Sequence, residues 1–429
     1  MNDEKALTNP PRYPASPGSD PAPVRLDRPL ARGRSSRLRR KRGILAASRR
    51  ARGFVALAVV AAGVSLVLLT AGFDRDDARG QSPGSHPGLE VSSPSSTEHQ
   101  SALPSPSARP IRVRQHTPSP IPGYLLIADR GNDRMLLVDS GKHVLWRYPK
   151  PGRGLSFPFN FDDDAFLAPN WRSIISNQEE QQTIEVISFP GGSLKWHYGH
   201  VGAAGSAAGY LHTPDDAYLL SNGDRIVADV GNCRVLVLSP TGRLIRQYGT
   251  TDVCAHSPPR LLGSPNGDTP VRGGGVLITE IMGSYVDLIG PHGNLLWSVH
   301  APVAYPSDAQ WLGGGRILLA DYSSPGQVLI LSRSGNVLWR YGPASGPGAL
   351  DHPSLALRLP NGLIAVNDDF RDRVVLIDPK RHRVVWQYGH TDRPGSSAGF
   401  LDIPDGMDFL PFRIAMSIRP IRKVVDQRR

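Results

Sequence analysis

The sequence predicts an all-β protein, a six-bladed β-propeller closed by its C-terminal strand and preceded by one transmembrane helix. Three observations lead to this prediction. A unit of about 47 residues recurs six times after residue 122, a surplus strand motif follows the sixth copy, and an uncharged apolar segment precedes the repeats. Repeats of this length, each with four short strands, are typical of propeller blades.

The clearest copy of the repeat runs from Leu211 to Gly249 and reads LHTPDDAYLLSNGDRIVADVGNCRVLVLSPTGRLIRQYG. Asn-Gly-Asp, Gly-Asn and Thr-Gly turns separate its four apolar stretches, and each stretch has the length of a strand. This arrangement predicts a four-stranded antiparallel meander.

Two positions spaced by two residues, mostly aromatic, mark the end of each copy. Side chains two apart in a strand lie on one face, so we expect these rings to pack between neighbouring sheets. The aligned pairs are Trp146/Tyr148, Trp196/Tyr198, Arg246/Tyr248, Trp297/Val299, Trp339/Tyr341 and Trp386/Tyr388.

The first and last copies are incomplete in complementary ways. Copies two to six begin with an innermost strand, whereas the first starts at Gly123 with a second-strand motif. A further first-strand motif, Leu401 to Leu410, follows the sixth copy. We expect this motif to pair beside Tyr124 to Ala128, which closes the ring and leaves no free sheet edge.

The charge distribution divides the chain into five parts. The predicted propeller has 24 basic and 28 acidic residues, so the net charge of +11 comes from outside it and does not indicate nucleic-acid binding. The parts are a basic cytoplasmic segment (1–53), a transmembrane helix (54–73), a Pro/Ser-rich linker (74–122), the propeller (123–411) and a basic tail (412–429).

The segment 54–73 has 20 residues without a charge, enough to cross a bilayer as a helix. Arg49, Arg50 and Arg52 precede it, and acidic residues follow it. The positive-inside rule then predicts a single-pass protein of the cell membrane, with a cytoplasmic N-terminus and the propeller outside. A cleaved signal peptide is the alternative, although residues 69–71 match a cleavage site poorly.

Both cysteines lie on the exported side of this topology. Cys233 falls between the second and third strands of its copy, and Cys254 follows the fourth strand, so both map to one rim. The compartment permits a disulfide between them, and two unpaired thiols are the alternative. Their spacing alone does not suggest zinc, which needs further Cys or His ligands nearby.

Residues 128–135 and 228–235 share the pattern Asp-x-x-Asn-x-Arg, and residues 367–374 keep a degraded form. The pattern resembles the core of NHL-repeat propellers, and the resemblance covers residues 123–411. It implies a binding module or one of a few lyase-like or lactonase-like enzymes. We expect the Asp, Asn and Arg side chains to be structural, with the Arg pairing with the Asp and lying across the next blade.

The segments Ser140-Gly141-Lys142 before Trp146 and Ser334-Gly335-Asn336 before Trp339 resemble the Gly-x-x-x-Trp segments of quinoprotein repeats. The resemblance implies blade packing, because quinone-binding members have eight blades and an adjacent cysteine pair. No quinone cofactor is expected here.

Acidic runs begin several of the innermost strands, at one mouth of the central channel. Converging carboxylates raise one another's pKa unless a cation or a basic ligand joins them. The mouth can therefore hold a cation such as calcium or receive a positively charged partner, or the carboxylates can simply cap the inner strands. The candidate ligand-binding residues are Asp164, Asp216, Asp308, Asp405, His212 and His352.

The function we expect is binding or scaffolding at the cell envelope, with an unidentified envelope protein or small ligand as partner. No catalytic residue, no metal site and no cofactor beyond a channel cation is predicted. The alternative is an exported lyase, lactonase or arylsulfotransferase-like enzyme working at the channel mouth, and a third is a spacer without a ligand. Gly-rich rim loops at 199–209 and 389–399 either recruit a ligand or only turn the chain.

Overall fold

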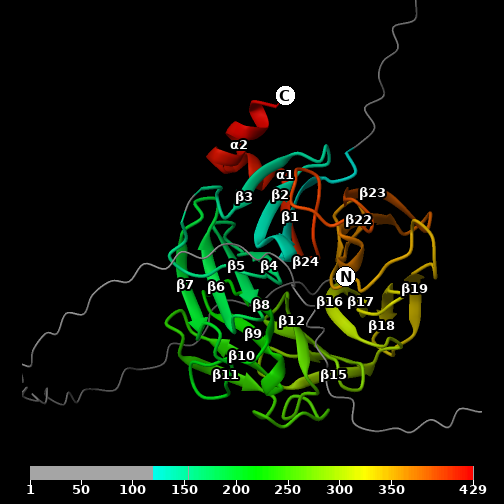
Figure 1. Cartoon of the computed structure of the whole chain (residues 1–429). Coiled ribbons are helices and arrows are strands. Elements are labelled where there is room, and N and C mark those ends of the chain that lie inside the picture. The colour runs from blue at the N-terminus through cyan, green and yellow to red at the C-terminus, as the bar shows by residue number, and fades with distance from the viewer. Residues whose placement is uncertain (1–118, 153, 429) are drawn as a thin grey trace, which may run out of the picture. The chain divides into compact units, whose positions relative to one another are not determined.

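Six four-stranded antiparallel sheets surround a common axis in the computed structural model, which describes residues 119–152 and 154–428 (Figure 1). The predicted six-bladed all-β propeller is confirmed. The predicted basic segment, the transmembrane helix 54–73 and nearly all of the linker lie outside the described residues. Within the described part, no helix has the length and apolar character needed to span a membrane.

The first three blades contain half of the strands, in order from the axis outward. Blade 1 consists of β24 (Pro404–Pro411), β1 (Gly123–Asp129), β2 (Arg134–Val138) and β3 (Val144–Tyr148). Blade 2 consists of β4 (Ala165–Leu167), β5 (Ser173–Gln178), β6 (Thr183–Ser188) and β7 (Leu194–Gly199). Blade 3 consists of β8 (Pro214–Leu219), β9 (Arg225–Asp229), β10 (Arg234–Leu238) and β11 (Leu244–Tyr248).

The other three blades repeat this arrangement. Blade 4 consists of β12 (Pro265–Val271), β13 (Gly275–Glu280), β14 (Tyr285–Ile289) and β15 (Leu295–His300). Blade 5 consists of β16 (Pro306–Gly313), β17 (Arg316–Asp321), β18 (Gln327–Ser332) and β19 (Val337–Tyr341). Blade 6 consists of β20 (Ala356–Arg358), β21 (Ile364–Asp368), β22 (Arg373–Asp378) and β23 (Arg383–Gly389).

Short 3-10 turns follow the second strand in three blades. They are η1 (Arg130–Asn132), η2 (Val230–Asn232) and η3 (Asp369–Arg371), which correspond to the three segments with the NHL-like pattern.

The C-terminal strand closes the ring on blade 1. In the β1–β24 pair, Tyr124 lies opposite Leu410 and Ile127 lies opposite Met407, both in antiparallel register. The predicted closure is therefore present, and β1 is paired on both of its edges.

The second strands are buried on both faces because each sheet is sandwiched between two neighbours. Every residue of β1 is buried, whereas residues of the outermost strands, such as β11 and β19, are largely exposed. This explains why the second and third strands read as continuous apolar runs rather than as alternating ones. The core of the propeller therefore lies between the blades.

The predicted aromatic residues cross the seams between neighbouring blades. The indole Nε1 of Trp146 in blade 1 donates to the carbonyl of Pro190 in blade 2, at 2.9 Å. Trp386 in blade 6 donates in the same way to Ser140 in blade 1, at 2.9 Å. Each indole thus buries its ring and satisfies its one donor across the seam.

The last residue of each second strand fixes the connection that arrives from the preceding blade. Its side-chain oxygen accepts a hydrogen bond from a backbone N–H of that connection, at 2.6 to 3.0 Å. The acceptors are Asp129, Gln178, Asp229, Glu280, Asp321 and Asp368.

In three blades an arginine binds both this acidic residue and the incoming connection. In blade 3, Arg234 donates from Nε to Asp229 at 2.6 Å and from Nη1 to the carbonyl of Ser206 at 2.9 Å. Arg134 and Arg373 make the equivalent contacts in blades 1 and 6. The expected Asp–Arg pairing is present, but the arginine binds the connection from the preceding blade instead of lying across the next one.

Two helices follow the last strand and pack on blade 1. They are α1 (Phe412–Ser417) and α2 (Arg419–Asp426), at the red end of the ribbon in Figure 1. Ile421 and Val425 of α2 are buried in the same apolar cluster as Tyr124 and Leu145. The tail, for which the sequence predicted only a basic character, therefore extends the core of blade 1.

We predict that Arg373→Met destabilises the propeller by about 3 to 5 kcal/mol, because it leaves the buried Asp368 carboxylate without its cation. Urea denaturation followed by tryptophan fluorescence measures this loss. The control is Arg381→Met, which removes a solvent-exposed guanidinium from its ion pair with Asp378 and is expected to cost much less than the loss of Arg373. Equal losses in the two variants would contradict the structural role of Arg373.

The two cysteines form a disulfide between Cys233 and Cys254. It joins the start of β10 to the connection that leaves blade 3. Replacing both cysteines by serine is expected to lower the free energy of unfolding by about 3 kcal/mol, from the chain entropy of a loop of this length. Denaturation with and without reductant checks this, since reductant should affect the parent chain and leave the double variant unchanged.

Candidate functional site

The inner ends of the blades meet in a ring of polar side chains on the propeller axis. Each blade contributes residues at or just before the start of its innermost strand. The connections between blades, which are hydrogen-bonded to the second strands as described above, lead directly into these positions. The residues lining the axial cavity are Asp164, Asp215, Asp216, Asn266, Ser307, Asp308, Ser354, Leu355 and Asp405.

This axial cavity has a volume of about 20 Å³. Such a space accommodates a water molecule or an ion of similar size. All four carboxylates singled out from the sequence, Asp164, Asp216, Asp308 and Asp405, line it. The structure thus brings these four residues together from four blades.

The two histidines singled out with them do not line the cavity. The His212 side chain is exposed at the rim, beside Gly231 in the turn after β9. The His352 ring packs against Tyr322 and Phe370, with Nδ1 at 2.6 Å from the Asp351 carboxylate. Both therefore lie apart from the axial carboxylates.

Asp216 is the most deeply buried of the four carboxylates, with 2% of its surface exposed. Its Oδ2 accepts a hydrogen bond from the backbone N–H of Asp268 at 3.1 Å, whereas its Oδ1 has no partner among the described residues. Asp268 is itself fully buried, and neither of its carboxylate oxygens has a partner there. Buried carboxylate oxygens of this kind are costly unless a cation or a proton compensates them.

Burial and mutual repulsion raise the pKa values of these groups. Burial, and then the neighbouring Asp308, Asp268 and Asp164, raise the pKa of Asp216 well above its ordinary value. Burial raises the pKa of Asp308 to about 6. The axial carboxyls therefore retain protons more readily than free ones unless a cation joins them.

Arg130 supplies positive charge at the edge of this ring. Its guanidinium extends from η1 and donates to Asp163, to Asp405 Oδ2 at 2.6 Å and to Glu179 Oε2 at 2.5 Å. The carboxylate oxygens of Asp163, Glu179 and Asp215 lie within 4.8 Å of one another, near Arg130. This role of Arg130 was not predicted from the sequence, because its place within the NHL-like motif gives no signal for contacts with the ends of blade 2 strands and with β24.

Neutral side chains tie the ring together between blades. Asn177 of blade 2 donates to Asp163 at 2.9 Å and to backbone carbonyls at the start of β8 in blade 3. Ser354 before β20 donates to the carbonyl of Asp405 in blade 1 at 2.8 Å. These contacts hold the carboxylates in a rigid arrangement, as a preorganised binding site requires.

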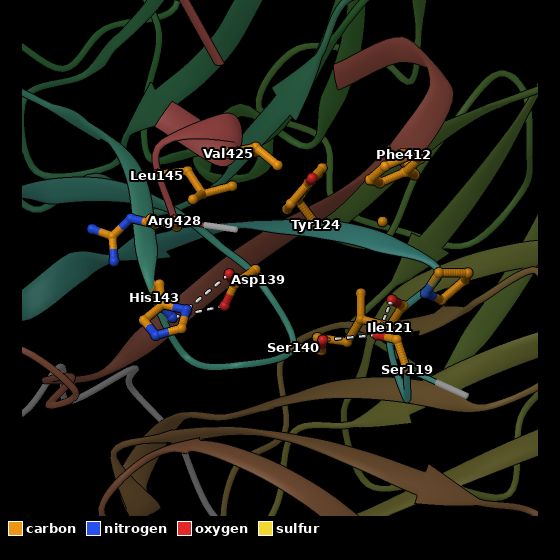
Figure 2. A pocket seen from close by; sticks show the side chains of 12 residues that line it. Ser119, Ile121, Tyr124, Asp139, Ser140, His143, Leu145, Phe412, Val425 and Arg428 are labelled. Atoms are coloured by element: carbon orange, nitrogen blue, oxygen red, sulfur yellow. Dashed lines mark hydrogen bonds and ion pairs between the residues drawn. The ribbon is translucent and has the colours of Figure 1, made fainter. Parts of the chain in front are cut away.

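A second, larger pocket lies at the outer side of blade 1 (Figure 2). It has a volume of about 520 Å³, and Tyr124, Leu145, Phe412 and Val425 form much of its apolar wall. Figure 2 shows the Asp139 carboxylate bonded to the His143 ring at its edge, at 3.0 Å from Nδ1. Ser119, the first described residue, also lines this pocket.

The Gly-rich rim loops are held by the arginine of the following blade. Arg234 binds the carbonyls of Ser206 and Tyr210 in the loop after β7. Arg134 binds those of Ser396 and Phe400 in the loop after β23. The loops thus serve to anchor the incoming strands.

No protein-family model matches this chain, and no curated protein matches it. Among solved structures, it is similar to a protein of unknown function from Bacteroides caccae, with 19% identity over 67% of this chain and 98% of the other, and a TM-score of 0.48. It is also similar to a streptogramin B lyase, with 16% identity over 57% and 72% of the two chains and a TM-score of 0.41. A further similar structure is a nidogen/laminin complex, with 12% identity over 66% and 97% and a TM-score of 0.45. At these identities the likeness concerns the fold alone.

We predict that, in chelator, the Asp308 carboxyl makes the propeller more stable as the pH falls from about 6 to about 4. The folded-state pKa of Asp308 is raised to about 6, above the ordinary value near 3.9. The folded state therefore binds more protons between these values, and stability falls as the pH rises through them. Melting temperatures across this range test it, and Asp308→Asn should flatten the profile. A parallel profile for the variant would contradict the prediction.

Proposed function

We propose that this chain is a single-pass membrane protein that displays its propeller outside the cell as a binding module of the envelope. In this proposal the segment 54–73 is the anchor and residues 74–122 form the stalk. The NHL-like pattern fits such a role, because the motif residues serve the architecture and leave the axis free for a ligand.

The ligand of the axial mouth is, in this proposal, a cation such as calcium or a cationic group of a partner. The supporting observation is the unpartnered Oδ1 of the buried Asp216, which lines a cavity of ionic size together with carboxylates from three other blades. Carboxylate and backbone oxygens are the donors that calcium prefers. A bound cation would also compensate the repulsion that raises the pKa values there.

The alternative of an enzyme at the channel mouth has less support. A cavity of about 20 Å³ is much smaller than the several hundred Å³ that an organic substrate needs. The two histidines expected near the mouth, which are the best candidates for acid–base chemistry, lie apart from it. The binding module is therefore the function that the geometry favours.

We predict that Asp216→Asn weakens calcium binding by about tenfold or more, because it removes a formal charge from the ring and one oxygen ligand. Isothermal titration of the purified full-length chain in detergent measures the affinity. The matched control is Asp224→Asn, at the opposite end of the same strand pair, where the side chain bonds only to the exposed turn. Its calcium affinity should equal that of the parent chain.

Two outcomes would count against the proposal. The parent chain would fail to bind calcium at millimolar concentration, or Asp216→Asn and Asp224→Asn would change the affinity equally. In the first case, crosslinking of the native membrane with mass spectrometry asks whether a protein with a basic segment occupies the mouth instead.

A further inference from the structure

Blade 4 lacks the buried Asp–Arg ion pair of blades 1, 3 and 6. Its acidic residue is Glu280, whose Oε2 accepts the N–H of Gly263 at 2.6 Å. Where Arg134 lies opposite Asp129 in blade 1, Tyr285 lies opposite Glu280 in blade 4. The buried Glu280 therefore lacks the cation that its counterparts have, and its Oε1 has no partner among the described residues.

A second buried acid lies on the same face of this sheet. Asp287 of β14 occupies the register position of Leu136 in blade 1 and Leu236 in blade 3, two residues after the first residue of the third strand. It is fully buried, and neither carboxylate oxygen has a hydrogen-bond partner in the described part of the chain. Burial, and then Glu280, raise its pKa to about 8, as expected for two acids without a cation.

A histidine from the connection between blades 3 and 4 completes this cluster. His256 Nδ1 lies 3.2 Å from Glu280 Oε2, and the ring of His256 stacks on that of Tyr285 with 3.5 Å between centroids. The other ring nitrogen, Nε2, lies 3.3 Å from Ser298 Oγ. The aromatic stack and the serine together hold the ring with Nδ1 toward Glu280.

We propose that His256, Glu280 and Asp287 bind a divalent transition-metal ion, for which Zn²⁺ is the best match. Each residue offers one ligand atom, and these atoms lie within 4.8 Å of one another. One imidazole nitrogen and two carboxylate oxygens are a donor set suited to zinc, whereas calcium and magnesium favour oxygen donors alone. With Nδ1 as the ligand atom, Nε2–H donates to Ser298 Oγ, which is the outer contact that metal-binding histidines usually make.

The residues around the proposed metal site hold two of its ligands rigidly and leave the third partly exposed to solvent. The two carboxylates are fixed on strands, whereas the His256 side chain is 25% exposed on a connection and can approach them. The disulfide at Cys254, two residues earlier, fixes the path of that connection. Three protein ligands leave a fourth position of a tetrahedral ion for water or an external ligand.

This site is independent of the axial carboxylates and of the function proposed for them. It lies where blade 4 faces blade 3, since Ile278, on the same face as Glu280, packs in one apolar cluster with Ile226 of blade 3. A bound ion would join the connection between these blades to the sheet of blade 4 and so take the place of the missing arginine.

The test is titration of Zn²⁺ into the full-length chain in detergent, with the disulfide intact so that no thiol competes. We expect about one tight site per chain, and His256→Gln and Asp287→Asn should each weaken it by about 100-fold or more. Co²⁺ should give the visible absorption of a tetrahedral site in the parent chain and lose it in both variants. Circular dichroism and melting temperatures establish that each variant is folded.

Two controls make the outcome specific to this cluster. His292→Gln, in the exposed turn between β14 and β15, and Asp224→Asn, in the exposed turn before β9, should both bind Zn²⁺ like the parent chain. Unchanged affinity in His256→Gln, or an equal loss in the two control variants, would overturn the proposal. The absence of tight binding in the parent chain would also overturn it and would leave a proton shared between Glu280 and Asp287 as the explanation of the pair.

Discussion

The structure depends on one repeated contact, the hydrogen bond from the connection between blades to the last side chain of the next blade's second strand. All six blades make it, with Asp in four of them, Gln in blade 2 and Glu in blade 4. Because the connection is held just before it enters the innermost strand, this contact sets where each innermost strand begins. It therefore also places the acidic residues that begin those strands on a common axis.

The buried acidic side chains of the propeller differ in whether a neighbouring group balances their charge. In blades 1, 3 and 6 an arginine compensates the buried acid, and in blade 5 Gln327 donates to Asp321 at 2.7 Å. On the axis and in blade 4, buried carboxylate oxygens have no such donor among the described residues. Glu185 Oε2 in blade 2 also lacks a partner among those residues, but the axis and blade 4 each gather two such acids, and these are the two places for which we propose ligands.

Much of the fold was predictable from the sequence. The repeat length and the turn residues recur in each copy, and the extra first-strand motif after the sixth copy indicates the closure of the ring. The four axial aspartates were also predictable, since each follows the same strand-initial pattern. The tail helices were missed, although Ile414, Ile418, Ile421 and Val425 recur at helical spacing. The His256 cluster was not predicted because its residues come from three segments. Alignment of the copies gives only a weak signal, since blades 1 and 3 have leucine at the position of Asp287 but blade 2 has the buried Glu185 there.

Closure by β24 has a consequence for the order in which the molecule can be assembled. Gly123 pairs with Pro411, a partner 288 positions later in the chain. Contacts so distant form late, because the intervening loop must first be brought together. During synthesis, blade 1 stays one strand short until residues 404–411 have emerged, with its inner edge open to other strands. β24 thus decides whether the sheet that contains β1 is completed.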